Sequence, residues 1–395
     1  MSSSPDSASP EDNTDNTDNT GHAKAASVDP GGLLEYSVVF TDRSLNHMSK
    51  AFQTVMTDIS ATLKAVYHAA AVAIVPGGGT FAMEAVARQL ATSKNCLVIR
   101  NGWFSYRWSQ IFEMGNIPAE ANVLCASAIE EGPQAAFAPP PIEDVVSTIK
   151  SQKPDLVFAA HVETASGIIL PDGYIGAMAE AVHASGGLLV LDCIASGAIW
   201  VDMTALGVDV LISAPQKGWS ASPCAGLVML SDAAVAALER ATSTSFACDL
   251  KKWLQIMQAY EAGGHAYHAT MPTDALVKFR DALKETEALG FEMLRRRQQE
   301  LGDKVRALLA SKGIKSVAAK GFAAPGVVVS YSDDPDIHNG SKFAAIGMQI
   351  AAGVPLQCGE PAGYQTFRLG LFGIDKLLNV ERALGQIGEA LDKVL

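Results

Sequence analysis

Cysteine is scarce in this 395-residue chain, and its spacing fits none of the uses that need several cysteines together. The chain has six cysteines and no Cys-x-x-Cys pair, and four of the six lie in apolar settings that are typical of buried thiols. Structural zinc sites and disulfide frameworks both depend on grouped cysteines. We therefore expect free, mostly buried thiols and no metal site.

Long apolar runs and an excess of positive charge are also missing. No apolar run is long and clean enough to span a bilayer. The formal net charge is -12, from 30 basic and 42 acidic residues. Because an acidic chain repels nucleic acid and anionic membrane surfaces, we expect neither as a partner. The composition favours a soluble, cytoplasmic protein.

The first 30 residues contain almost nothing apolar. They hold six acidic residues against one lysine and include the repeat DNTDNTDNT. This composition predicts a disordered acidic tail over residues 1–30. The segment lacks the basic start and apolar stretch of a signal peptide, and it is not arginine-rich like a transit peptide.

Short apolar runs alternate with amphipathic segments from about Ala71 to Leu230. Fully apolar runs of this length are typical of strands buried on both faces of a sheet. The predicted strands are Ala71–Val75, Cys96–Arg100, Asp155–Ala160, Leu188–Asp192, Val208–Ser213 and Gly226–Leu230. The predicted helices between them include Phe81–Ala91, Asp144–Lys150 and Gly173–Ala184. The alternation indicates an α/β fold with a mostly parallel sheet.

After Pro272 the alternation of short apolar runs and amphipathic segments gives way to longer helical patterns. One or two long helices are predicted over Asp274–Ser311. The elements predicted after them are a strand at Gly326–Ser330, a helix at Lys342–Ala352, a strand at Thr366–Leu369 and a final helix from Lys376. We therefore expect a large domain over residues 31–285 and a smaller C-terminal α+β domain over residues 286–395.

Lys217 and Asp192 each follow or end a predicted buried strand. A lysine there is costly to bury unless it is used, although a surface loop lysine is the commoner case. A desolvated lysine has a lowered pKa and can form an imine. Asp192 either caps the next helix or meets a ligand at the carboxyl edge of the sheet. A cofactor with a cationic ring nitrogen needs such an acid.

Other segments could surround a ligand at the same edge. Gly77–Thr80 follows a strand and opens a helix, where free backbone N–H groups bind phosphate, although most glycine-rich turns are only turns. It matches neither GxGxxG nor a P-loop, which disfavours a nicotinamide-dependent oxidoreductase. The stretches NGWFSYRW and HVETASG follow further strands. Arg368 lies in an apolar strand, where it either clamps a carboxylate or pairs with a buried acid.

The order of these motifs resembles that of class V aminotransferases of fold type I, and most closely the alanine/serine–glyoxylate transaminase group. The resemblance runs from about residue 70 to the C-terminus. Its most specific part is LLVLDCIASG followed, 25 residues after Asp192, by Lys217 in GVDVLISAPQKGW. The segments AYHATMP and FRLGLFG add support. The family implies a mostly parallel seven-stranded sheet, pyridoxal 5'-phosphate (PLP) as cofactor, and a homodimer.

The resemblance also implies a role for each matching residue. Lys217 would hold PLP as an imine and move the substrate proton, Asp192 would pair with the ring nitrogen, and Arg368 would bind the substrate carboxylate. The residues implied to contact the phosphate or ring are Gly78, Gly79, Thr80, Phe104, Thr164, Ile194 and Gln216. Tyr267 and Thr270 would reach the phosphate of a neighbouring subunit. The stacking ring is assigned to Phe104 or, one position earlier, Trp103.

The resemblance predicts transfer of an amino group from a small amino acid, such as alanine or serine, to a 2-oxo acid such as glyoxylate or pyruvate. The Pro-Gly-Pro segment usual in the family is missing; the corresponding stretch reads SVVFTDRSLNHMSK. A PLP-dependent lyase or cysteine desulfurase is the nearest alternative, because Cys358 precedes Arg368 by ten residues. A non-catalytic scaffold protein is a further alternative, but it would need none of Lys217, Asp192 and Arg368.

Overall fold

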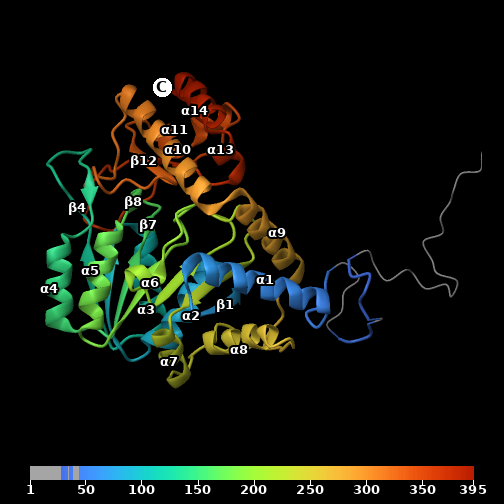
Figure 1. Ribbon diagram of the computed structural model, residues 1–395. Coiled ribbons are helices and arrows are strands. Elements are labelled where there is room, and N and C mark those ends of the chain that lie inside the picture. The colour runs from blue at the N-terminus through green and yellow to red at the C-terminus, as the bar shows by residue number, and fades with distance from the viewer. Residues whose placement is uncertain (1–27, 34, 39–43) are drawn as a thin grey trace, which may run out of the picture.

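The computed structural model describes residues 28–33, 35–38 and 44–395. Residues 1–27 of the predicted acidic tail therefore lie outside the described residues, and so does part of the stretch SVVFTDRSLNHMSK. Figure 1 shows the strands of a large sheet below a group of C-terminal helices. Within the described ranges, no helix has both the length and the apolar character needed to cross a membrane.

Seven strands form the central sheet in the order β1-β11-β10-β9-β6-β2-β3. Their bounds are β1 Ala71–Pro76, β2 Asn95–Arg100, β3 Glu120–Cys125, β6 Leu156–Ala160, β9 Leu188–Asp192, β10 Val210–Ser213 and β11 Ala225–Leu230. Only β11 runs against its neighbours β1 and β10. The prediction of a mostly parallel seven-stranded sheet is confirmed, and so are all six predicted strands.

The sequence pattern missed β3. Among the described strands it pairs only with β2, and it lies at the edge of the sheet. Its first two residues are exposed and the other four are half-buried, whereas β6 is buried throughout. An edge strand does not need the continuous apolar run by which the other strands were found.

Helices connect the strands and pack against the sheet. Their bounds are α1 Lys50–Tyr67, α2 Gly79–Val86 with a π-helical turn η1 Ala87–Ala91, α3 Trp103–Gly115, α4 Ile142–Gln152, α5 Asp172–His183, α6 Met203–Leu206, α7 Asp232–Arg240 and α8 Leu250–Glu261. α2 packs against β1, β10 and β11, α3 against β2 and β6, and α5 against β6 and β9. The core includes the packed rings of Trp108, Phe112 and Phe158.

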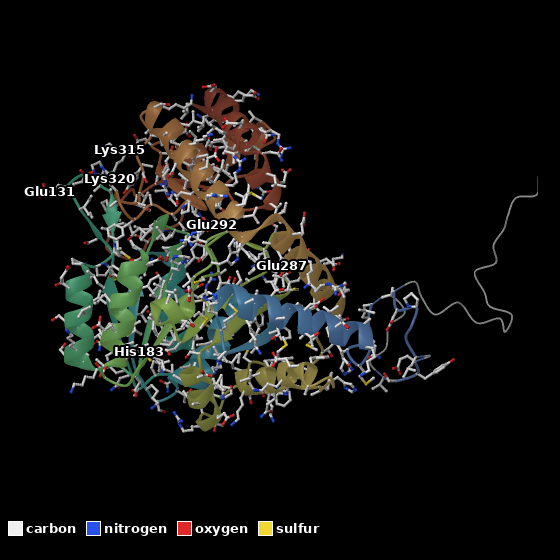
Figure 2. The ribbon with its side chains drawn as sticks, viewed as in Figure 1. Glu131, His183, Glu287, Glu292, Lys315 and Lys320 are labelled. Atoms are coloured by element: carbon white, nitrogen blue, oxygen red, sulfur yellow. The ribbon has the colours of Figure 1, made fainter. Side chains whose placement is uncertain are left out.

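The elements after α8 are α9, which packs against α1, and a second, three-stranded antiparallel sheet with helices beside it. Their bounds are α9 Thr273–Leu289, α10 Phe291–Ser311, β12 Val327–Tyr331, α11 Pro335–His338, α12 Ser341–Ala345, β13 Ala351–Ala352, β14 Thr366–Gly370, α13 Ile374–Leu378 and α14 Val380–Val394. The strand order is β12-β14-β13. The predicted long helical region is two helices, because Gly290 between them has φ +91°. Figure 2 shows Glu287 and Glu292 on either side of this break.

Four two-residue strands form short antiparallel ladders beside the large sheet. They are β4 Ser127–Ala128 with β5 Phe137–Ala138, and β7 Val162–Glu163 with β8 Ile168–Ile169. The second pair lies in the loop after β6 and holds its residues in a fixed register.

The helix predicted over Lys342–Ala352 is wrong beyond Ala345. Gly347 has φ +83°, a left-handed conformation that ends a helix, and Met348 N–H closes the turn on Phe343. The chain then becomes extended, and Ala351 and Ala352 pair with β14. Pairing with a strand that follows later in the chain overrides the local helical pattern.

Candidate active site

Most of the predicted site residues follow strands that run in one direction. β1, β2, β6, β9 and β10 point the same way, because β11 alone is reversed. Their carboxyl ends therefore meet at one edge of the sheet, where open α/β sheets bind ligands. The loops that leave this edge carry the glycine-rich turn, the start of α3, the segment HVETASG, Asp192 and Lys217.

A cavity of about 400 Å³ lies at this edge. Nine of the predicted site residues line it, namely Gly79, Thr80, Phe104, Thr164, Asp192, Ile194, Gln216, Lys217 and Arg368. The other lining residues are Met83, Arg107, Val162, Ala195, Val327, Ala351, Gly370 and Phe372. The tertiary structure thus brings residues from the large sheet and from the three-stranded sheet to one place.

Three predicted residues do not line this cavity. Gly78 is the N-cap of α2, directly before the lining residue Gly79. Tyr267 and Thr270 are exposed, and their hydroxyl oxygens lie 3.2 Å apart. Trp103 does not line the cavity either; it packs on Tyr106 with ring centroids 5.6 Å apart. Of the two candidate aromatic rings, the cavity therefore contacts that of Phe104.

Asp192 is a buried carboxylate at the end of β9. It is 6% exposed, and its Oδ1 accepts a hydrogen bond of 2.9 Å from the backbone N–H of Ile194. Burial raises the pKa of Asp192 to about 7, and the nearby charge of Glu163 adds to the rise. The charged carboxylate therefore gains from a cationic partner in the cavity.

Lys217 lies in a tightly packed turn after β10. A Cβ on Gly218 would lie 2.0 Å from the carbonyl oxygen of Gly197, so the two backbones approach as only glycine allows. Trp219 is buried and its ring contacts Tyr67 and Trp200, which anchors the turn in the core.

The amine of Lys217 faces an aromatic ring, with Nζ 5.5 Å from the ring centroid of Phe372. Among the described residues no acidic side chain forms an ion pair with this amine. Burial lowers the pKa of Lys217, and the positive charge of Arg368 lowers it further. A larger share of the amine is therefore neutral and nucleophilic than in water.

Two guanidinium groups lie against the ring of Phe104. The Cζ of Arg368 is 5.5 Å and that of Arg107 is 5.2 Å from the ring centroid. Arg107 also donates a hydrogen bond of 3.0 Å to the hydroxyl of Thr80, and Arg368 donates one of 2.7 Å from Nε to the carbonyl oxygen of Ala352. The site is thus strongly cationic and suited to anionic groups.

Sequence reasoning missed Glu163, which organises the start of α3. Its carboxylate is fully buried and accepts hydrogen bonds from the backbone N–H groups of Phe104, Ser105 and Ala165, at 2.8–3.1 Å, and from the Ser105 hydroxyl at 2.7 Å. A carboxylate at a helix N-terminus also interacts favourably with the helix dipole. Because 58 residues separate Glu163 from Ser105, no local spacing predicts this contact.

Arg107 and Phe372 were also missed, and here the sequence held a signal. Arg107 follows Phe104 by three residues on α3, so the two side chains share a helix face. Phe372 lies in FRLGLFG, four residues after Arg368. Residues at these spacings from a predicted site residue were candidates for the same cavity.

The comparisons with known proteins show the family of the chain. The aminotransferase class-V family model matches residues 33–324, and the chain belongs to this family. It is therefore a PLP-dependent aminotransferase of fold type I.

Several of the similar proteins carry transaminase names. The chain is 30% identical to the 2-aminoethylphosphonate–pyruvate transaminase of Pseudomonas aeruginosa (strain UCBPP-PA14), over 80% of this chain and 81% of that protein. It is 27% identical to the alanine–glyoxylate aminotransferase of Rattus norvegicus, over 69% of this chain and 64% of that protein. The structure of an alanine–glyoxylate aminotransferase from Nostoc sp. superposes with a TM-score of 0.74 at 22% identity, covering 88% of this chain and 89% of that chain.

The residues of the cavity fit PLP. The buried side-chain oxygen of Gln216 has no hydrogen-bond partner among the described residues, so a ligand could supply one. A Cβ on Gly79 would lie 2.3 Å from Cδ1 of Ile194, so the packing beside the cavity leaves no room for a side chain at this position. The amine of Lys217, which has no ion-pair partner among the described residues, suits the aldehyde of PLP. The buried carboxylate of Asp192 suits a cationic ring nitrogen, and the start of α2 suits a phosphate.

Proposed function

We propose that this enzyme moves an amino group from a small amino acid, such as alanine or serine, to a 2-oxo acid such as glyoxylate or pyruvate. The observation that carries the proposal is that the Lys217 amine, the Asp192 carboxylate and the Arg368 guanidinium line one cavity. The names of the relatives support pyruvate and glyoxylate as acceptors.

The chain would hold PLP through residues from several loops. Asp192 would pair with the ring nitrogen, and Phe104, Ile194 and Thr164 would contact the ring and its substituents. The phosphate would lie at the start of α2, against Gly78, Gly79 and Thr80 and beside Gln216. When bound, PLP withdraws electrons from the substrate and makes its Cα–H acidic. The hydrogen bond from Arg107 would fix the Thr80 hydroxyl for this contact.

Lys217 and Arg368 would handle the substrate. Arg368 would bind the carboxylate of the amino acid with a guanidinium that is already oriented by its bond to Ala352. The Lys217 amine, with its lowered pKa, would take the proton from the substrate Cα and deliver it to the cofactor carbon that carries the aldehyde in free PLP. The partly enclosed cavity would limit the access of water during this transfer.

We also propose a homodimer with shared sites, a cytoplasmic location and a two-domain chain divided near residue 285. Exposure of Tyr267 and Thr270 away from this chain's own cavity supports a contact with a second subunit. Scattered cysteines without framework spacing support a reducing compartment. The helix break at Gly290, close to the proposed boundary, supports the division.

A PLP-dependent lyase or desulfurase gains no support from the cavity. That activity would need a thiol that reaches the substrate, and Cys358 is not among the residues that line the cavity. Its sulfur lies 3.4 Å from the carbonyl oxygen of Arg100 instead. A non-catalytic scaffold protein would need neither the cationic cavity nor a Lys217 amine that has no ion-pair partner among the described residues.

A half-reaction screen tests the proposed substrates. Purified enzyme loaded with PLP is mixed with one amino donor at a time, and the visible absorbance of the bound cofactor is followed. We expect alanine or serine to bleach the visible band, and glyoxylate or pyruvate to restore it. Bleaching only by 2-aminoethylphosphonate, or release of sulfide from cysteine, would contradict the proposal.

A labelling experiment tests the proposed lysine. Borohydride reduction of the loaded enzyme should fix the cofactor to the peptide that contains Lys217, as seen by mass spectrometry. The Lys217→Ala variant should give no labelled peptide, whereas the control Lys252→Ala, which changes an exposed lysine on α8, should label like the wild type. A label on any other lysine would refute the assignment.

A further inference from the structure

Two cysteines from distant parts of the sequence lie side by side near the cavity. Cys125 ends β3, and Cys358 lies in the segment between β13 and β14. The Cys358 sulfur is 3.4 Å from the carbonyl oxygen of Arg100, and Arg100 is the direct strand partner of Cys125. Both cysteines therefore flank Arg100 at the end of β2. The other four cysteines are buried.

The segment that carries Cys358 is held in a tight turn. The Glu360 carboxylate accepts hydrogen bonds from the backbone N–H groups of Leu356, Gln357 and Cys358. Gln357 has φ +61°, which is uncommon for a residue other than glycine. A guanidinium N–H of Arg100 donates a bond of 3.2 Å to the carbonyl oxygen of Gln357. Arg100 therefore ties this turn to the end of β2, beside Cys125.

The surroundings make one thiol of the pair the better nucleophile. Both cysteines are half-buried, so a small oxidant can approach. The hydrogen bond from Cys358 lowers the pKa of Cys125, and the positive charge of Arg100 acts in the same direction. The pKa of Cys358 is raised by its contact with Cys125 and by burial. The pair thus places a thiol with a lowered pKa next to a thiol that can resolve the product.

We propose that Cys125 and Cys358 form a reversible disulfide when the enzyme meets a peroxide. The Cys125 sulfur attacks one oxygen of hydrogen peroxide, the O–O bond breaks, and hydroxide leaves and is protonated to water. The resulting Cys125 sulfenic acid is attacked by the Cys358 sulfur, the S–O bond breaks, and the departing hydroxide takes the Cys358 proton. Two thiols and one peroxide give one disulfide and two water molecules.

The bond would join the two sheets of the molecule. It would fix the end of β3 to the segment that leads into β14, and β14 carries Arg368 of the cavity. The crosslink would close a loop of more than 200 residues, which stabilises the folded state by restricting the unfolded chain. The inference does not depend on the substrate, because the bond is detected without turnover.

The test uses the full-length wild-type enzyme, treated with hydrogen peroxide and then with an alkylating reagent under denaturing conditions. We expect a subunit mass lower by two hydrogen atoms before alkylation, a digest with Cys125 and Cys358 peptides linked, and recovery of both thiols with dithiothreitol. The oxidised enzyme should also unfold at a higher temperature than the reduced enzyme.

Two variants make the result specific. Cys358→Ser should give no crosslink and should accumulate Cys125 sulfenic acid, which dimedone traps. Cys248→Ser, which changes a buried cysteine elsewhere, should still crosslink like the wild type. Alkylation of both cysteines in the peroxide-treated wild type would overturn the proposal. So would a disulfide that joins two subunits on a non-reducing gel.

Discussion

At the residue scale, the chemistry of Asp192 follows from its burial. Among the described residues no cationic side chain forms an ion pair with this carboxylate, and one backbone N–H is its hydrogen-bond partner. Burial therefore dominates and raises its pKa to about 7. A bound cationic ring would reverse this effect, because an adjacent positive charge favours the carboxylate form.

The raised pKa of Asp192 predicts a pH-dependent loss of stability in the cofactor-free protein. Between the ordinary pKa of 3.8 and about 7, the folded state holds a proton that the unfolded state has lost. This contribution to the free energy of unfolding therefore falls as pH rises through that window and levels off above it. Asp192→Asn should remove the fall, measured as the difference in melting temperature between variant and wild type from pH 4 to 8.

The same substitution has a second expected outcome with PLP present. Asp192→Asn should bind the cofactor more weakly and lose most activity, since its amide cannot balance a ring cation. A variant that matches the wild type in cofactor affinity and turnover would show that Asp192 does not contact the ring. Asp202→Asn, at an exposed helix cap, is the matched control.

The proposed contact between Arg368 and the substrate carboxylate predicts weaker substrate binding when Arg368 is replaced. Its planar guanidinium can bind a carboxylate with two parallel hydrogen bonds, which a lysine amine cannot reproduce. Arg368→Lys should raise KM for the amino acid by about 10- to 100-fold, the effect of losing one hydrogen bond to a charged group. Steady-state kinetics measure this change, and Arg382→Lys, in an exposed ion pair with Asp375, should be neutral. A fall in kcat alone would assign Arg368 a different role.

At the scale of elements, the site depends on close packing of the turn after β10. The backbones of Gly218 and Gly197 are in close contact. This contact packs the turn that carries Lys217 against the segment that follows Asp192. The buried Trp219 locks the same turn against α9 and α10 through the rings of Phe279 and Phe291. The geometry of the turn that carries Lys217 is therefore set by the core packing.

This packing predicts that adding one methyl group at Gly218 lowers the free energy of unfolding. Gly218→Ala would place a carbon 2.0 Å from the Gly197 carbonyl oxygen, so the backbone must shift. The free energy of unfolding should fall by about 1–3 kcal/mol, and cofactor binding should weaken with it. Gly173→Ala, in α5 with open space around it, should raise stability by about 0.5–1 kcal/mol. Denaturant unfolding of both variants tests the contrast.

At the scale of the whole molecule, Tyr267 and Thr270 raise the question of a second subunit. Both are exposed and lie away from the cavity of their own chain. If they serve a partner's site, two inactive variants can complement each other. In a mixed dimer, the site that keeps Lys217 would receive intact Tyr267 and Thr270 from the other chain.

The complementation experiment is direct. Lys217→Ala is mixed with the double variant Tyr267→Phe, Thr270→Val, and the subunits are allowed to exchange. We expect the mixture to regain activity that neither variant has alone, up to one working site per mixed dimer. No gain after confirmed exchange would show that these residues act within their own chain or not at all.

The sequence by itself determined the sheet and the polar residues at its carboxyl edge. Buried strands must be apolar, so their positions could be read directly, and Asp192 and Lys217 stood out because charge is costly there. The half-exposed edge strand β3 carried no such signal. The helix predicted through Ala352 failed because pairing with β14 outweighed local preference.

Only the tertiary structure decided which distant residues meet. Glu163 caps α3 across 58 residues, Arg107 and Arg368 share one aromatic ring, and Cys125 lies beside Cys358. Contacts of this kind depend on how strands and helices are ordered in space. Local composition and spacing fix the elements, whereas the burial and charge that set each pKa arise only after those elements have packed.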